Sequence, residues 1–131
     1  MGREGFRKLI VWQNAYKLRK LVYETTKRFP QSEMRRVSQM RDAARSIKQN
    51  IQEGYGKSLG EYIHSLGISQ GSVRELSGDV EDCFDDGLIT RKEFERLNEL
   101  CGKTNYLFMR LIQSLKRKAH QDSRKLTGPH N

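Results

Sequence analysis

Four basic residues recur at seven-residue steps near the end of the chain, and their spacing suits contact with phosphate groups. They are Arg96, Lys103, Arg110 and Arg117. In a helix, a seven-residue step returns a side chain to almost the same face, and three such steps at 1.5 Å per residue span about 30 Å. A basic stripe of that length can follow several phosphates of a nucleic acid. Lys17, Lys20 and Lys27 form a shorter outward basic group in the first helical segment.

The charge of the chain favours a polyanionic partner. The net charge is +9, and residues 1–30, 31–57, 58–87 and 88–131 contribute +6, +3, −6 and +6. A basic surface attracts polyanions through counterion release, whatever their sequence. The pattern does not distinguish RNA from DNA or from an acidic protein, and each single cation is equally typical of a solvated helix face.

Residue patterns for catalysis or metal binding are weak in this sequence. The histidines are His64, His120 and His130, and neither cysteine has a nearby base in the sequence. Glu61 and His64 match the Glu-x-x-His element of di-metal helical bundles once, whereas such a site requires two copies. We therefore expect no enzymatic activity, no cofactor and no metal site.

Apolar residues at alternating three- and four-residue steps predict four helices and no strands. The four runs extend over residues 11–29, 37–51, 62–83 and 94–115. Cys83 and Cys101 both fall on apolar positions, which predicts reduced core residues. Because every connection is short, we expect an all-α, antiparallel, up-down-up-down four-helix bundle. Residues 1–119 form the single predicted domain, and residues 120–131 form a polar tail predicted to be disordered.

Local signals mark where the predicted helices begin and end. Ser32 is a candidate cap for the second helix, and the Gly54–Gly56 segment for its end. Two capping boxes open the third and fourth helices: Ser58 with Glu61, and Thr90 with Glu93. Acidic residues crowd the end of the third helix, where the helix dipole disfavours them, so we expect a basic side chain opposite.

No apolar run approaches the roughly 20 residues of a membrane span, and the N-terminus is charged, so we expect a cytoplasmic protein without membrane association.

Several small and apolar residues are left outside the predicted core. Gly67, Gly71 and Gly78 lie on the outer side of the third helix, where each glycine costs up to about 1 kcal/mol relative to alanine unless another backbone approaches closely. The remaining apolar residues are Trp12, Tyr16, Tyr23, Ile68, Phe84, Tyr106 and Met109. A wide core could absorb them individually; together they predict a homo-oligomer, with an interface that includes Trp12 and the three glycines.

The segment from Ser38 to Gly56, SQMRDAARSIKQNIQEGYG, resembles the signature of the 23S rRNA intervening sequence (ribosomal S23-like) family. That family is related to the accessory variability proteins of diversity-generating retroelements. The similarity extends over about residues 6–116, and the stretch from Ser46 to Gly54 is its most specific part. Many members have a second arginine where this chain has Asp42, and often a proline where it has Lys48.

The resemblance implies an antiparallel four-helix bundle, assembly into a pentameric barrel, and a basic surface that engages nucleic acid, in some members alongside a reverse transcriptase. It implies no activity. We therefore expect a non-enzymatic, oligomeric, nucleic-acid-binding accessory protein whose basic helix surfaces contact phosphates. The alternative is a protein-interaction scaffold that docks a polymerase or another acidic partner through the same surface.

Overall fold

The protein is a bundle of four α-helices in a computed structural model that describes residues 2–127. The described residues contain no strand, so the predicted all-helical fold of four helices is confirmed. The α-helices are α1 (Ile10–Thr26), α2 (Met34–Gly54), α3 (Leu59–Asp85) and α4 (Arg91–Thr127). Two short 3-10 helices, η1 (Gly2–Lys8) and η2 (Gln31–Glu33), precede α1 and α2.

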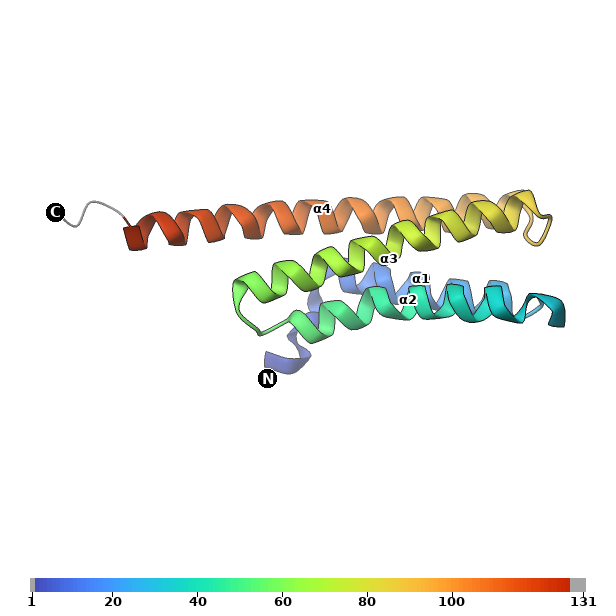
Figure 1. The fold of residues 1–131 in the computed structure, drawn as a ribbon, viewed down its shortest axis with the longest axis horizontal. Helices are drawn as coiled ribbons and strands as arrows, with labels where there is room; N and C mark the ends of the chain where they lie inside the picture. Colours follow the sequence, from blue (N-terminus) through green and yellow to red (C-terminus); the bar gives the residue numbers. More distant parts are fainter. Residues whose placement is uncertain (1, 128–131) are drawn as a thin grey trace.

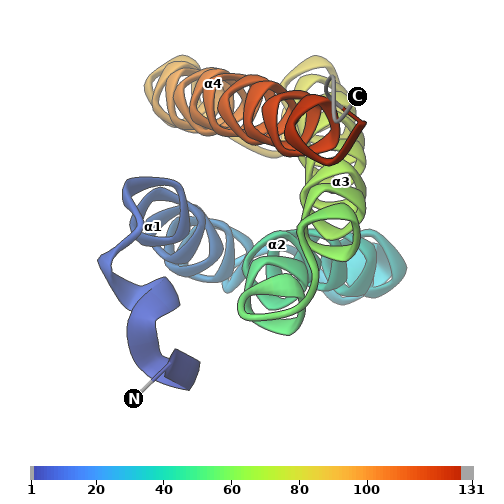
Figure 2. The same cartoon turned by 90° about the vertical axis from the view of Figure 1, so that its left-hand side faces the viewer.

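The four helices form a ring in chain order. α1 packs against α2 and α4, and α3 packs against the same two helices from the other side. Seen end on, the ring leaves α4 and α2 on opposite sides (Figure 2). The α1–α2 and α3–α4 connections lie at one end of the bundle and the α2–α3 connection at the other (Figure 1).

Most of the core consists of the apolar positions that the periodicity predicts, and Phe6, Trp12, Ala43, Ile89 and Ile112 add to it. Leu18, Ile47, Leu76 and Phe108, one from each helix, are fully buried. Cys83 and Cys101 are buried free thiols, as predicted, and burial raises the pKa of both. A raised pKa keeps these thiols protonated, so they act as small apolar side chains.

Small residues bring α2 and α3 into close contact. A Cβ atom on Gly54 would lie 2.6 Å from the Cβ atom of Ser65, so α2 requires glycine at this position for space. Further along the same seam, the Ser69 hydroxyl donates to the carbonyl of Ile47 at 2.8 Å. The left-handed backbone of the turn lies at Gly56, with φ of +87°, rather than at Gly54.

The helix starts are only partly as predicted. Thr90 and Glu93 form the predicted reciprocal capping box, with N–H to side-chain distances of 2.8 and 3.1 Å. The Ser58 hydroxyl accepts from the Glu61 N–H at 3.3 Å and thereby caps α3. Ser32 does not cap α2, because the chain enters that helix through η2, where the Glu33 N–H bonds to the Pro30 carbonyl at 2.8 Å.

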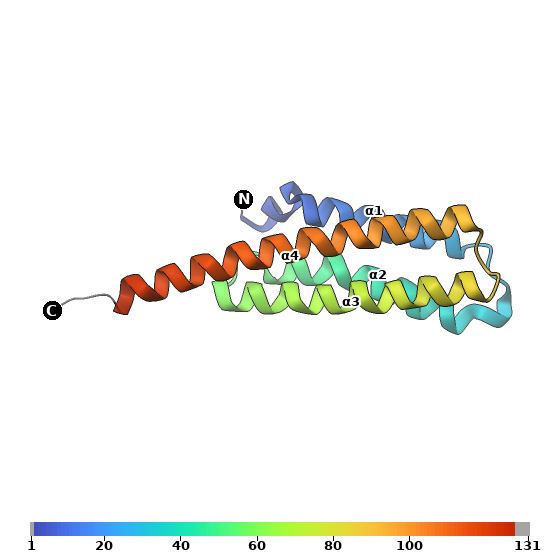
Figure 3. The ribbon, with the colours of Figure 1, turned by 90° about the horizontal axis from the view of Figure 1, so that it is seen from above.

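The predicted end of the fourth helix is wrong. α4 has 37 residues and continues through residues 120–127, for which the sequence predicts a disordered tail. The reason is that no glycine or proline occurs between Gly102 and Gly128, so nothing in residues 103–127 stops the helix. At about 55 Å, α4 projects beyond the other helices (Figures 1 and 3). The rest of the predicted tail, residues 128–131, lies outside the described residues.

Trp12 lies inside the bundle instead of on the outer surface where the sequence places it. Its side chain is 8% exposed, and its ring centroid is 5.4 Å from that of Phe6. The indole N–H donates to the side-chain oxygen of Gln52 in α2 at 3.0 Å. The physical reason is that η1 folds back along α1 and α2 and covers this indole, so Trp12 does not supply exposed area to a subunit interface.

Within residues 2–127, no helix combines the length and apolarity needed to cross a lipid bilayer.

Replacement of Gly54 tests the close contact between α2 and α3. Gly54→Ala forces its new methyl group against Ser65, and we expect unfolding free energy to fall by about 1 to 3 kcal/mol. Urea denaturation followed by circular dichroism measures the change. Gly60→Ala is the matched control, since a Cβ atom there meets no atom within 4 Å, and equal losses in both variants would contradict the explanation.

Candidate functional site

The predicted basic stripe of α4 is exposed but does not run straight along one face. Arg96, Lys103, Arg110 and Arg117 are all exposed. Because an α-helix has 3.6 residues per turn, a seven-residue repeat drifts by about 20° per step, or about 60° from Arg96 to Arg117. Arg96 borders a groove of about 200 Å³ between α1 and α4, lined also by Leu21 and Arg28. Later members of the stripe therefore turn away from α1.

The basic group predicted on α1 divides between two flanks of the helix. Lys17 precedes Leu21 by one helical turn and so lies on the flank that faces α4. Lys20 and Lys27 lie elsewhere: their ammonium groups are 5.6 and 5.7 Å from the ring centroids of Tyr16 and Tyr23. The structure thus associates two of the predicted lysines with two exposed aromatic rings.

A second concentration of cations covers the outer side of α1 and α2, and we call it the α1–α2 cationic surface. Its members come from η1, α1 and α2: Arg7, Arg19, Lys20, Lys27, Arg41, Arg45 and Lys48.

Hydrogen bonds and ring contacts fix the centre of this surface. The Lys48 ammonium donates to the Gln52 side-chain oxygen at 3.3 Å, and the Trp12 indole donates to the same oxygen. The Arg7 guanidinium carbon lies 5.4 Å from the centroid of the Trp12 ring. α1 and α2 are therefore joined under a layer of positive charge.

Electrostatics show that the positive charges of this surface act on one another. Burial lowers the pKa of Lys48, and the neighbouring charges of Arg19, Arg45 and Arg7 lower it further. The Arg45 guanidinium lies 3.5 Å from the Asp42 carboxylate, and both side chains are largely exposed to solvent. Lys27 likewise lies 3.3 Å from the Glu24 carboxylate. Two carboxylates against seven cations leave the surface with a net positive charge, so it attracts anions.

Most of the α1–α2 cationic surface is missed by reasoning from the sequence. Its residues come from three segments of the chain, and only the folded structure brings Arg7 and Arg19 to the same place as Lys48. One signal is present: Arg41, Arg45 and Lys48 follow steps of four and three residues, which is the spacing of a helical face. The seven-residue step that identifies the α4 stripe does not detect that spacing.

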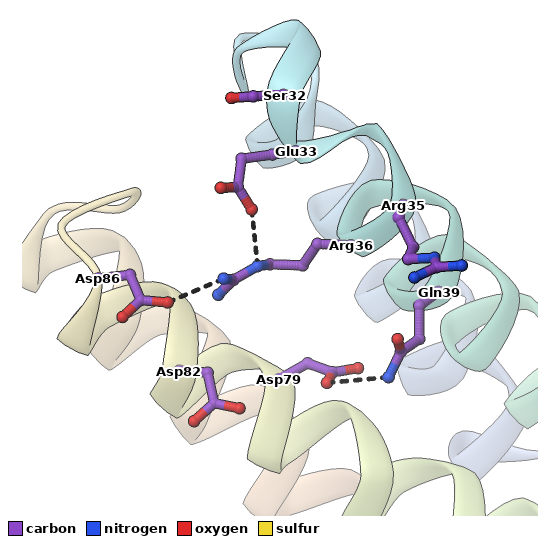
Figure 4. Close-up of a pocket in the computed structure, with 8 residues that line it drawn as sticks. All are labelled: Ser32, Glu33, Arg35, Arg36, Gln39, Asp79, Asp82 and Asp86. Atoms are coloured by element: carbon purple, nitrogen blue, oxygen red, sulfur yellow. Dashed lines mark hydrogen bonds and ion pairs between the residues drawn. The ribbon is translucent and has the colours of Figure 1, made fainter.

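The acidic end of α3 faces a basic partner on α2, as predicted. Arg36 donates to Asp86 at 2.8 Å and pairs with Glu33 at 2.9 Å, while Gln39 donates to Asp79 at 3.4 Å (Figure 4). These side chains line a pocket of about 410 Å³. The hydrogen bond to Asp86 is the main cause that raises the pKa of Arg36. The cluster therefore links α2 to α3. Within residues 2–127, no group of His, Cys, Asp or Glu side chains is arranged to hold a metal ion.

The outer side of α3 and α4 differs in character from the α1–α2 cationic surface. Gly67, Gly71 and Gly78 have open space where a side chain would stand. A groove of about 430 Å³ between α3 and α4 is lined by Gly78 and Gly102, among other residues. On α4, the exposed apolar side chains of Tyr106 and Met109 follow Gly102 by one and two helical turns. Exposed Ile68 instead lies three turns before Asp79, on the flank of α3 that faces α2. Because Arg74 and Glu81 also line the groove, this face combines small and apolar residues with two opposite charges, whereas the α1–α2 face carries mostly positive charge.

Comparisons with known proteins agree on the family and the fold. Residues 7–127 match the family model described as 23S rRNA-intervening sequence protein. A crystal structure from Bacteroides thetaiotaomicron VPI-5482, described as a protein with unknown function from the S23 ribosomal protein family, is similar with a TM-score of 0.72 and 22% sequence identity. The similarity covers 79% of this chain and 98% of that one. No curated protein matches the chain.

Replacement of Asp79 tests the electrostatics of the pocket shown in Figure 4. Burial, followed by the charges of Glu75 and Asp82, raises the pKa of Asp79. A raised pKa means that the folded protein holds the proton more readily than the unfolded chain, so stability falls as pH rises above the ordinary value of 3.8. Asp79→Asn should therefore raise the melting temperature at pH 7, and the gain should vanish below about pH 3.8.

Thermal unfolding followed by circular dichroism at pH 7 and at pH 3 measures this difference. Glu81→Gln is the control, because it removes one negative charge from an exposed position of the same helix. A lower melting temperature for Asp79→Asn at pH 7 would show that the carboxylate is stabilising. A gain that persists at pH 3 would show that the gain does not come from removal of the negative charge.

Proposed function

Because the chain belongs to the 23S rRNA-intervening sequence protein family, we propose that it is a non-enzymatic, oligomeric protein that binds nucleic acid through basic helix surfaces. The observation that carries this proposal is the α1–α2 cationic surface. There, cations from three segments converge closely enough for three arginines to lower the pKa of Lys48. Binding of a polyanion relieves the repulsion between such closely spaced positive charges, so the electrostatic free energy of binding is favourable.

The distribution of charge around the ring supports binding on one side. The acidic residues of α3 lie behind α2, where Arg36 already pairs with two of the nearby carboxylates. A nucleic acid is repelled by the exposed acids of α3 and attracted by the cations of α1 and α2. Arg96 and Lys17 extend the attraction along the α1–α4 side, where phosphate contacts release further counterions.

The oligomer that we propose uses the outer face of α3 and α4. Gly78 and Gly102 line the groove between these helices, and a second backbone can approach them closely because neither has a side chain. Tyr106 and Met109, one and two helical turns after Gly102, supply exposed apolar area on α4. The resemblance to the family supports the finer assignments: an antiparallel up-down-up-down bundle and assembly as a pentamer.

An acidic protein is the alternative partner for the same cations, and a polymerase such as a reverse transcriptase is the candidate that the family resemblance supports. A partner co-purified from native lysate and retained after nuclease treatment favours this alternative. A partner that disappears after the treatment favours nucleic acid.

Neutralisation of the α1–α2 cationic surface tests nucleic-acid binding. We expect the double variant Arg45→Gln/Lys48→Gln to bind a structured RNA more weakly than the unmodified protein. The slope of log affinity against log salt should become less steep by about 1 for each phosphate that the variant no longer neutralises. Gel-shift titrations at several salt concentrations measure both quantities.

Arg35→Gln is the matched control, because Arg35 is an exposed arginine of α2 beside the acidic pocket. We expect its affinity and salt slope to stay close to those of the unmodified protein. Negligible binding by the unmodified protein at about 50 mM salt, where phosphate contacts are strongest, would refute the proposed function.

Substitution of an outer glycine tests the oligomer. In the single chain, Gly78→Gln meets open space and gains helix propensity of about 0.5 kcal/mol or more, so the helices should be retained. In an assembly that packs against this glycine, the longer side chain separates the subunits. We expect light scattering after gel filtration to show a mass close to the 15.3 kDa of one chain. An unchanged assembled mass would place the interface elsewhere.

A further inference from the structure

Two tyrosine–lysine pairs repeat along α1, and each pair presents an aromatic ring to solvent. Tyr16 precedes Lys20 by four residues, and Tyr23 precedes Lys27 by the same step. The Tyr16 and Tyr23 side chains are 40% and 45% exposed, which is high for aromatic rings. The two rings are seven residues apart, so they lie about 10 Å apart along the helix and on nearly the same side.

Each ring is fixed against a flat neighbour. The Trp12 and Tyr16 rings stack with centroids 5.4 Å apart and an interplanar angle of 7°. The Arg41 guanidinium carbon lies 3.9 Å from the centroid of the Tyr23 ring. Both supports are held in turn: the indole donates to Gln52, and Arg41 donates to the Thr26 hydroxyl at 3.0 Å. The exposed ring area is therefore already ordered before any ligand arrives.

Both rings stand within the α1–α2 cationic surface, and this placement indicates what they bind. An exposed ring among arginines and lysines offers stacking and phosphate contact together, which is the combination found in single-strand-binding proteins. In a duplex, the base faces are already stacked on one another and cannot lie flat on a side chain. Lysines one turn after each tyrosine are placed to contact the phosphate of a stacked nucleotide.

We propose that Tyr16 and Tyr23 stack on unpaired bases, so that the ligand of the α1–α2 cationic surface is a single-stranded nucleic acid segment. This inference rests on the proposed function and specifies the ligand of the same surface. At about 3.4 Å per stacked nucleotide, the spacing of the rings corresponds to bases roughly three positions apart. Stacking is tolerant of sequence because every base has a flat face, so the site selects strandedness rather than a base sequence.

Fluorescence anisotropy with labelled 12-nucleotide probes tests the inference. The probes are a mixed-sequence single strand, made as RNA and as DNA, and the corresponding duplexes. We expect Tyr16→Leu and Tyr23→Leu each to weaken single-strand binding about 5-fold to 100-fold, with little change in duplex affinity. Tyr16→Phe and Tyr23→Phe should bind like the unmodified protein, because they retain the ring. Ring-dependent binding of single-stranded RNA or of single-stranded DNA supports the proposal equally.

The controls separate stacking from charge. Ile10→Ala removes an apolar side chain of α1 that is 62% exposed and lines the groove between α1 and α4 instead of this surface, and it should not change binding. Arg45→Gln/Lys48→Gln should weaken single-strand and duplex binding alike. The stacking proposal is overturned if the leucine variants of Tyr16 and Tyr23 keep full single-strand affinity while the charge variant loses it, or if Ile10→Ala causes an equal loss. Absence of binding to every probe at low salt would instead refute the proposed function.

Discussion

The close approach of α2 and α3 constrains the rest of this bundle. Gly54 leaves room for Ser65. Further along the contact, the Ser69 hydroxyl donates to the carbonyl of Ile47, and the Ser72 hydroxyl donates to that of Ser46. On another side of the same helix, Arg41 and Gln52 reach α1, where they hydrogen-bond to Thr26 and Trp12. The same helix therefore supplies the tightest packing contact and, through Arg41, Arg45 and Lys48, much of the α1–α2 cationic surface.

The order of the helices around the ring then separates the charges. α3 carries most of its acids next to the start of α2, where Arg36 pairs with Glu33 and Asp86. These pairs occupy a basic residue that would otherwise add to the positive surface. On the α1 side, Glu24 and Asp42 pair with Lys27 and Arg45, and the other cations of the surface leave it with a net positive charge. Local neutralisation at one end thus leaves the positive potential concentrated on α1 and α2.

The sequence predicts what depends on neighbours in the chain and misses what depends on distant contacts. Apolar periodicity identifies the helices, and the capping box at Thr90 and Glu93 is present because its two residues are only three apart. The position of Trp12 depends on η1 folding back over it, for which no periodic signal exists. Ser32 has the right residue type for a cap, but the 3-10 turn after Pro30 determines how α2 begins. The members of the α1–α2 cationic surface can be grouped only once the contact between α1 and α2 is known.

The two faces of the ring serve different proposed contacts without competing for the same residues. The glycines of α3 and α4 lie apart from the tyrosines and cations of α1 and α2, so a subunit contact through those glycines does not itself cover the α1–α2 cationic surface. An oligomer built in this way presents the α1–α2 cationic surface once per subunit. A strand that reaches two subunits binds the second one at a high effective concentration, so affinity can rise by orders of magnitude without any new contact. Modest stacking and phosphate contacts in each subunit are then sufficient for firm binding by the assembly.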